Sequence, residues 1–236
     1  MNSNQKIAII IPAYNEELVI GDVVKGIIKY CNQNKYMYEV IVVDDGSKDR
    51  TALKAKESGA TIIKHILNMG SGGATATGLS YACHNNFYIA ATMDADGQHL
   101  PQDVIKGIEL MKKGNKDLII GSRLMNNNGM SKAKLLGNIG LSWITFMLFG
   151  IKVTDSQSGL RVFSKKSLEN LHWETSGYEY CSEMIWRANQ QKLIIGEYPI
   201  STIYTEYSSH KGQSNWNAFN IVSRLIRRRV LELINE

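Results

Sequence analysis

The sequence predicts an α/β fold, with a mostly parallel sheet that carries helices on both faces. Two observations support this prediction. Short, almost wholly apolar runs alternate with helical patterns through the first half of the chain, and strands of this composition must be covered on both faces. In addition, clusters of acidic residues and glycines follow directly after these runs, which is where an open parallel sheet places its ligand site.

The first half contains five predicted strands, and a predicted helix follows each of the first four. The strands are expected at 7–11, 40–43, 61–65, 88–93 and 118–120, and the helices at 16–30, 51–58, 75–84 and 103–113. Pro12 cannot donate to a ladder and therefore ends the first strand. Ser47 or Asp49 is placed to cap the second helix.

The second half is less regular. An apolar, glycine-interrupted helix is expected at 135–149, strands at 160–163 and 193–200, and a long final helix from about residue 217. No repeat divides the chain, so a single domain over 1–236 is expected. The helix at 135–149 is short for a membrane span and is either a core helix or one that lies in a membrane interface. The residues alone favour the core.

The composition indicates a globular protein with anionic partners. The 236 residues are 44% hydrophobic and carry a formal charge of +5, and four arginines lie near the end, at positions 224, 227, 228 and 229. This charge favours nucleotides, phospholipid headgroups or nucleic acid. The three cysteines are far apart, as in reduced cytosolic proteins, and the sequence contains no recognisable signal peptide or membrane span. We therefore expect a soluble or peripheral protein.

Two aspartates, Asp94 and Asp96, directly follow the apolar run 88–93. Alternate side chains of an extended segment share a face, so both carboxylates reach one edge of the sheet. Hard oxygen ligands at this spacing suit Mg²⁺ or Mn²⁺ carrying a diphosphate. The alternative is an acidic loop that keeps the strand end soluble. His99, five residues after Asp94, could be a further ligand on the metal side.

A second acidic corner, Asp44 and Asp45, follows the strand at 40–43. A carboxylate there can accept a hydrogen bond from a nucleobase imide or a ribose hydroxyl, and Tyr14 after the first strand could cover the base. The alternative is a simple turn. Two adjacent aspartates repel each other unless something compensates their charge.

The glycine-rich segment 68–73 precedes the third predicted helix. Main-chain donors at a helix N-terminus could meet phosphate. As a dinucleotide-binding motif the segment is weak, because it follows the third strand and not the first. Close packing of Gly70, Gly72 and Gly73 against a ligand or a neighbouring helix explains these glycines equally well.

Two arginines, Arg123 and Arg161, follow the fifth strand and the segment 154–160. Arginine is a planar, permanently charged donor suited to holding phosphates. Asp155 and Glu183 could each act as a general base or organise Arg161 through an ion pair. If the acceptor is already an ionised phosphate, no base is required, and this favours the organising role.

Together these residues resemble the family 2 glycosyltransferases of GT-A fold, and within them the polyprenyl-phosphate (dolichyl-phosphate) hexose synthases. The likeness covers almost the whole chain and rests on motifs in the same order at similar separations. The motifs are Ile-Pro-Ala-Tyr-Asn-Glu at 11–16, Val-Asp-Asp-Gly-Ser-Lys-Asp-Arg-Thr at 43–51, Met-Asp-Ala-Asp-Gly-Gln-His at 93–99, Gly-Ser-Arg at 121–123, the segment 155–161, Glu183 and Gly-Glu-Tyr-Pro-Ile at 196–200.

The resemblance implies a nucleotide-sugar donor, a Mg²⁺ or Mn²⁺ ion and inverting attack by a lipid phosphate. UDP-glucose, UDP-N-acetylhexosamine and GDP-mannose all stay open as donors, and no nucleic acid partner is expected. The resemblance assigns the metal to Asp94, Asp96 and Gln98, and catalysis to Asp94, Asp96, Arg123, Asp155 and Arg161. It places the donor and its metal beside Pro12, Ala13, Tyr14, Glu16, Asp44, Asp45, Gly73, Asp94, Ala95, Asp96, Gln98, Arg123 and Lys134. Lys132 is a further expected basic contact.

The resemblance also divides the chain into a nucleotide-sugar-binding half, 1–123, and a half for the acceptor and the membrane interface, 124–236. It places 135–149 against a membrane, which replaces the preference for a core helix. The chain departs from the family near its end, where Gly212-Gln213-Ser214-Asn215 stands in place of a Gly-x-Ser-Lys element. His210 or Lys211 could make that anionic contact. We therefore expect peripheral association with the cytoplasmic face of a membrane.

Three alternatives remain from the sequence. A family 2 transferase acting on a sugar or protein hydroxyl would need a general base, for which Asp155 and Glu183 are the candidates. A phosphoryl-receiver module also pairs aspartates with Mg²⁺, but it needs a lysine after the last strand, where Gly121-Ser122-Arg123 stands. The third is a nucleotide-sugar-binding protein without activity.

Overall fold

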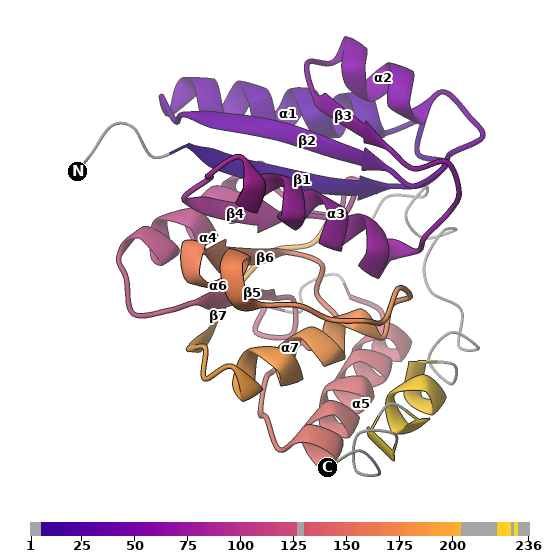
Figure 1. The fold of residues 1–236 in the computed structure, drawn as a ribbon, viewed down its shortest axis with the longest axis vertical. Helices are drawn as coiled ribbons and strands as arrows, with labels where there is room; N and C mark the ends of the chain where they lie inside the picture. Colours follow the sequence, from indigo (N-terminus) through magenta and orange to yellow (C-terminus); the bar gives the residue numbers. More distant parts are fainter. Residues whose placement is uncertain (1–5, 127–129, 204–220, 228, 231–236) are drawn as a thin grey trace.

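One seven-stranded sheet organises the chain, in the order β3-β2-β1-β4-β6-β5-β7. The computed structural model describes residues 6–126, 130–203, 221–227 and 229–230 (Figure 1). The strands are β1 Ile7–Ala13, β2 Tyr38–Asp44, β3 Thr61–Lys64, β4 Ile89–Thr92, β5 Leu118–Ser122, β6 Arg161–Ser164 and β7 Ile195–Pro199. The helices are α1 Ile20–Gln33, α2 Thr51–Glu57, α3 Ser71–His84, α4 Pro101–Lys112, α5 Lys132–Phe149, α6 Lys165–Asn170 and α7 Tyr180–Gln190.

The sheet is parallel except at β6, and this confirms the predicted α/β class. Strand β1 pairs in parallel with β2 and β4, β2 with β3, and β5 with β7. Strand β6 lies between β4 and β5 and runs antiparallel to both. The carboxyl ends of β1, β2, β4 and β5 therefore meet at one edge of the sheet, where the predicted site residues follow the strands.

Helices cover both faces of this sheet, as the apolar strands required. Side chains of β1 alternate between the faces, because successive residues of a strand point to opposite sides. Ile9 and Ile11 belong to the core that α1 and α4 cover. Ile10 belongs to the core that α3 and α7 cover. Helix α5 lies away from the sheet, beside α7 (Figure 1).

Several element boundaries differ from the sequence predictions. Helix α1 begins at Ile20 and not at residue 16, because the main-chain amides of Asn15, Glu16 and Glu17 bind side chains of the 47–51 segment and not a helical turn. Helix α3 begins earlier than predicted, at Ser71, and so includes glycines that were assigned to a loop. Helices α6 and α7 were not predicted. Residues 221–227 and 229–230 of the predicted final helix are helical, and the other residues from 217 onward lie outside the described ones.

Helix α5 is predominantly apolar and packs in a small cluster separate from the two cores of the sheet. Ser131 caps its first turn by accepting a hydrogen bond from the Lys134 amide, and Gly150 ends it in the left-handed conformation, with φ of 73°. The helix buries Leu141, Ser142 and Thr145. A stripe of apolar side chains stays exposed, and its members are Leu136, Ile139, Trp143, Phe146 and Met147. None of the described helices combines the length and hydropathy of a membrane span.

Candidate active site

A cavity of about 600 Å³ opens at the carboxyl edge of the sheet, where the sequence predicted the site. Most of the predicted site residues line it, namely Pro12, Ala13, Tyr14, Glu16, Asp45, Asp94, Ala95, Asp96, Gln98, Arg123 and Lys134. The predicted residues that lie outside its lining are Asp44, Gly73, His99, Lys132, Asp155, Arg161 and Glu183. The fold therefore brings the ends of β1, β2, β4 and β5 together with the first turns of α5.

Asp94 and Asp96 reach the cavity from the turn after β4. The Asp94 Oδ2 atom lies 3.0 Å from His99 Nε2, and Asp96 Oδ1 accepts a hydrogen bond of 3.0 Å from the Gln98 amide. Burial and the neighbouring Asp94 carboxylate raise the pKa of Asp96 to about 6. Desolvation also raises the pKa of Asp94, but the His99 hydrogen bond and the Arg123 and Arg161 charges outweigh it and lower that pKa. The two carboxylates of this site therefore have pKa values shifted in opposite directions.

His99 is the hydrogen-bond partner of Asp94 and does not line the cavity, so its role as a ligand on the metal side stays a prediction. One ring nitrogen, Nε2, is committed to Asp94. The other, Nδ1, is buried and has no hydrogen-bond partner among the described residues. His99 is absent from the residues that line the cavity.

Gly159 permits the close approach of the Asp94 carboxylate. A Cβ atom built at Gly159 would overlap both oxygens of Asp94. The Gly159 carbonyl accepts a 2.8 Å hydrogen bond from Thr92 Oγ1, which fixes the loop against β4. A side chain at position 159 must therefore displace Asp94.

We predict that Gly159→Ala lowers any metal-dependent activity of this site by about 10²-fold, because a displacement near 1 Å of a reacting group costs about that much. The protein should stay folded, since the Asp94 side chain can move into the cavity. Activity and circular dichroism of Gly159→Ala against wild type would check this. The matched control is Gly140→Ala on α5, which lies outside the cavity lining and where a Cβ meets no atom within 4 Å; equal activity of the two variants would contradict the prediction.

The two aspartates after β2, Asp44 and Asp45, have different positions, and each carboxylate has its own hydrogen-bond or ion-pair partners. Asp45 lines the cavity and accepts hydrogen bonds from the amides of Met69 and Gly70, both at 2.8 Å, and one of 2.7 Å from His65. Asp44 is fully buried, accepts from the Ser47 amide and lies 3.8 Å from Lys64 Nζ. These partners offset the repulsion between the adjacent charges. Of the two, only Asp45 can meet a ligand in the cavity.

The glycines of the 68–73 segment serve close packing, which was the alternative to phosphate binding. The Gly70 amide donates to Asp45 and the Gly72 amide donates to the Ser176 carbonyl, at 2.7 Å. A Cβ at Gly70 or Gly72 would overlap the backbone of residues 175–176. Because these two donors are used within the protein, Gly70 and Gly72 favour the close-packing alternative, and phosphate binding by the other amides of the segment stays a prediction. Gly73 packs against Met69 and lies outside the cavity lining.

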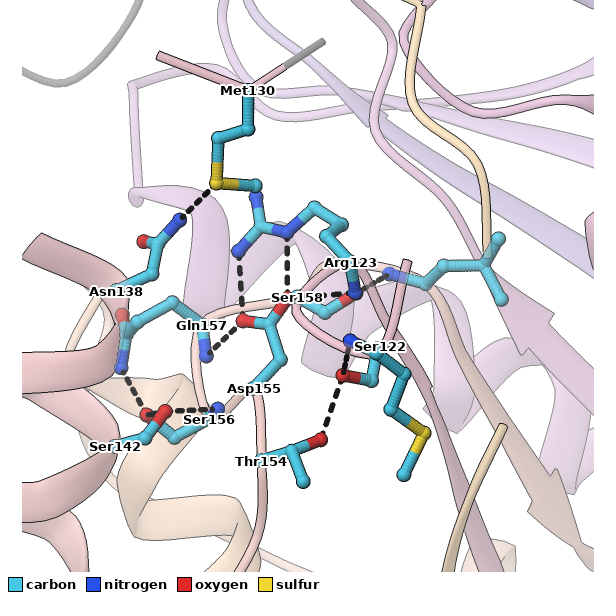
Figure 2. A network of polar contacts seen from close by, with 12 residues as sticks. Ser122, Arg123, Met130, Asn138, Ser142, Thr154, Asp155, Ser156, Gln157 and Ser158 are labelled. Atoms are coloured by element: carbon cyan, nitrogen blue, oxygen red, sulfur yellow. Dashed lines mark hydrogen bonds and ion pairs between the residues drawn. The ribbon is translucent and has the colours of Figure 1, made fainter. Parts of the chain in front are cut away.

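Arg123 reaches the cavity from the end of β5, held by a buried carboxylate (Figure 2). Its Nε and Nη2 atoms donate to the two oxygens of Asp155 at 2.7 and 2.9 Å, and its amide donates to the same side chain. Burial opposes ionisation of Asp155, but the Arg123 charge and hydrogen bonds lower its pKa. Glu197 of β7 in turn accepts from the amide and hydroxyl of Thr154, beside Asp155. The predicted ion pair of Asp155 is therefore made with Arg123.

Arg161 has a structural role and does not line the cavity. Its side chain is fully buried and donates to the carbonyl oxygens of Ser156, Ser158 and Cys181. These bonds join the loop before β6 to the N-terminal turn of α7. The prediction that Asp155 or Glu183 pairs with Arg161 is wrong, since Glu183 accepts from the Thr175 amide and hydroxyl and lies 3.5 Å from Arg187.

Sequence reasoning missed the wall of the cavity opposite β1 and β2. Tyr178, Tyr180 and Cys181 line it from the start of α7, and Gln157 lines it from the loop before β6. Helix α5 adds Ala133, Gly137, Asn138 and Leu141. The helical apolar pattern of 180–190 could have predicted α7. The residues His210 to Asn215, singled out in the sequence, lie outside the described part of the chain.

Comparison with known proteins matches the chain to one family. The profile described as Glycosyl transferase family 2 matches residues 8–171. The chain is 44% identical to a UDP-N-acetylglucosamine–dolichyl-phosphate N-acetylglucosaminyltransferase of Methanococcus voltae, over 95% of this chain and 96% of that protein. It is 27% identical to a dolichyl-phosphate β-glucosyltransferase of Dictyostelium discoideum, over 98% of this chain and 76% of that protein.

The fold is similar to that of glucosyl-3-phosphoglycerate synthase from Mycobacterium tuberculosis. The crystal structure of that enzyme in complex with Mn²⁺, UDP and glucosyl-3-phosphoglycerate has a TM-score of 0.68 to this chain at 18% identity. The match covers 98% of this chain and 80% of that chain.

Proposed function

The chain belongs to glycosyl transferase family 2, and on this premise we propose that it moves a hexose from a nucleotide sugar to a polyprenyl phosphate, with inversion. Membership of the family excludes the phosphoryl-receiver alternative. The observation that carries the proposal is the separation of charge within the cavity. Its lining carboxylates, Glu16, Asp45, Asp94 and Asp96, follow β1, β2 and β4, while the cations Arg123 and Lys134 follow β5 and begin α5.

This separation favours an acceptor that is already an anion. Transfer to a hydroxyl needs a base beside the acceptor. Both oxygens of Asp155 are engaged by Arg123, its side chain is fully buried, and Glu183 is equally buried. A phosphate needs no base and is attracted by Arg123 and Lys134. The four lining carboxylates would then belong to the donor half, 1–123, while Arg123 at the end of that half and Lys134 in the acceptor half, 124–236, would face the acceptor.

The residues at the end of β4 fit a divalent metal ion. Among the described residues there is no cluster of three or more His, Cys, Asp or Glu side chains arranged to enclose a metal. Mg²⁺ and Mn²⁺ in transferases are commonly held by one or two carboxylates, with substrate phosphates and water completing the shell. Asp96 and Asp94 would hold the ion, with the Gln98 side chain beside it. The raised pKa of Asp96 fits this role, because a cation would relieve its repulsion with Asp94.

Catalysis would rest on positioning and on charge. The bound cation supplies positive charge to the departing diphosphate. Tyr14 and Asp45 would contact the nucleobase, and Gln98 would lie near the sugar. Arg123, oriented by Asp155, and Lys134 would hold the acceptor phosphate in line with the anomeric carbon.

The identity to the Methanococcus voltae enzyme supports UDP-N-acetylglucosamine as the first donor to test, with UDP-glucose and GDP-mannose next. The test incubates the purified protein and Mn²⁺ with each radiolabelled donor and either a short polyprenyl phosphate or the corresponding polyprenol. We expect label in the phosphate product only, with one preferred donor. Transfer to the polyprenol would favour the hydroxyl-acceptor alternative, and donor binding by calorimetry without any product would favour a protein without activity.

The metal affinity should depend on pH. A proton and a metal ion compete for Asp96, whose pKa is raised to about 6. Below that pKa, Mn²⁺ affinity is therefore expected to fall about tenfold for each pH unit, and above it the affinity should level off. Titration of Mn²⁺ in the presence of UDP between about pH 5 and 8, followed by electron paramagnetic resonance, would measure this. An affinity that is constant over this range would contradict the assignment of Asp96.

We also propose peripheral contact with the cytoplasmic face of a membrane, through α5. Leu136 and Trp143 are 70% and 61% exposed on its apolar stripe. The helical residues from 221 to 227 pack on α5 through Ile221 and Leu225, and add the exposed basic side chain of Arg227. An apolar stripe with flanking cationic charge suits anionic headgroups.

The double variant Leu136→Ser/Trp143→Ser should bind anionic vesicles about 10²-fold less tightly, because each side chain contributes about 1.5–3 kcal/mol when fully buried. Transfer to a short, water-soluble acceptor should persist. Vesicle co-sedimentation measures the first effect and the transfer assay the second. The matched control is Leu53→Ser, half exposed on α2 at the far end of the molecule (Figure 1); if it loses as much vesicle binding, α5 is not the contact.

A further inference from the structure

The His99 ring is buried, and among the described residues its one polar contact is with a carboxylate of the cavity, that of Asp94. Its side chain is 1% exposed, whereas that of Asp94 is 47% exposed. The Nε2 atom lies 3.0 Å from Asp94 Oδ2, and Nδ1 has no hydrogen-bond partner within the described chain. Within the described part of the chain, the ring therefore hydrogen-bonds to Asp94 alone, through Nε2.

The backbone of His99 is fixed independently of the cavity. His99 forms an antiparallel bridge with Thr202, and the neighbouring Gln98 carbonyl accepts a 3.0 Å hydrogen bond from the Ile203 amide. Asp103 accepts from the Ser201 amide at 2.9 Å and so ties the same segment to α4. The ring is thus a rigid donor, because the segments on both sides of it are hydrogen-bonded.

The Asp94 carboxylate lies between this donor and a backbone surface. His99 binds Oδ2, and the Cα of Gly159 lies close to the rest of the group, where a Cβ would overlap it. Two contacts from opposite elements leave the carboxylate little rotational freedom. Such outer contacts decide the orientation and affinity of metal-binding carboxylates.

We propose that His99 is a positioning residue that holds one oxygen of Asp94 in place so that the carboxylate is presented to the metal in a single orientation. This inference rests on the proposed function, since it assigns Asp94 to the metal. It gives His99 a role through Asp94 and not as a ligand. It also requires a donor at the position of Nε2, whatever the rest of the side chain.

The test compares Mn²⁺ binding, with and without UDP, in wild type and in three variants by electron paramagnetic resonance. His99→Phe keeps the ring and loses the donor, and its Mn²⁺ affinity should fall about 10- to 100-fold. His99→Gln places an amide donor near the Nε2 position and should restore most of the affinity. His99→Asn carries the same amide on a shorter chain and should not. His84→Phe is the matched control, because His84 bonds only to Ser80 on the exposed face of α3.

The outcomes separate this inference from the proposed function. If wild type fails to bind Mn²⁺, the metal site itself is wrong and the inference falls with it. If wild type binds Mn²⁺ and His99→Phe binds it equally, the proposed function stands and the positioning role is overturned. If His99→Phe does not fold, equal affinities of His99→Gln and His99→Asn overturn the role instead. Thermal unfolding of every variant identifies a loss that is only structural.

Discussion

Replacing Asp96 with asparagine is expected to reduce glycosyl transfer by about 10³-fold or more without destabilising the protein. The variant removes the charge that would hold the cation against the departing diphosphate. Stability should not fall, because burial and Asp94 raise the pKa of Asp96 and so make its ionised form unfavourable in the metal-free protein. At neutral pH the neutral amide removes this repulsion, and the unfolding temperature should stay equal or rise.

Transfer rates and thermal unfolding of Asp96→Asn, each with and without Mn²⁺, would check this result. Wild type should gain stability from Mn²⁺ and UDP, and the variant should not. Asp22→Asn, an exposed aspartate in the first turn of α1, is the charge control and should behave as wild type. Wild-type transfer that persists in EDTA would contradict a metal at Asp96.

Asp155→Asn is expected to destabilise the protein by about 3 kcal/mol and to weaken acceptor binding. The substitution leaves the Arg123 guanidinium without its buried counter-charge, and breaking a buried ion pair from one side costs about 3–5 kcal/mol. For a chain of this size the unfolding temperature should fall by roughly 10 °C. Because Arg123 also loses its orientation, we expect a higher KM for the polyprenyl phosphate and a fall of about 10²-fold in kcat/KM.

This variant separates the phosphate acceptor from the hydroxyl acceptor. If Asp155 is a base, Asp155→Asn should collapse kcat while the acceptor KM stays unchanged. If it orients Arg123, the double variant Asp155→Asn/Arg123→Gln should lose less stability than the two single losses added together. Denaturant unfolding of the four proteins gives this coupling, and additive losses would contradict the pairing.

The first half of the chain could be predicted because its information is local. Apolar runs such as 40–43 fix strands, and the acidic or glycine-rich residues after them must then lie at one edge of a parallel sheet. Asp45, Asp94 and Asp96 reach the cavity for this reason. The helix starts were less accurate, since side chains from the 47–51 segment, distant in sequence, decide where α1 begins.

The second half could not be read in the same way, because its contacts are long-range. Strand β6 inserts between β4 and β5 in the antiparallel sense, and no local pattern specifies that pairing. The partners of buried charged side chains are likewise determined by contacts between residues that are distant in sequence. The sequence predicts that Arg123, Asp155 and Arg161 belong to one site, but only the folded loop shows that Asp155 binds Arg123 while Arg161 binds carbonyl groups.

Helix α5 lines the cavity with residues between Ala133 and Leu141 and exposes its apolar stripe from Leu136 to Met147. Under the proposed function, the isoprenoid tail of the substrate can stay in the hydrocarbon phase while its headgroup is glycosylated at the lipid surface. Pulling the tail into water would cost about 0.8 kcal/mol for each methylene, and this arrangement avoids that cost. Isoprene units beyond those near the headgroup should therefore contribute little to turnover, and one enzyme could serve lipids of several lengths.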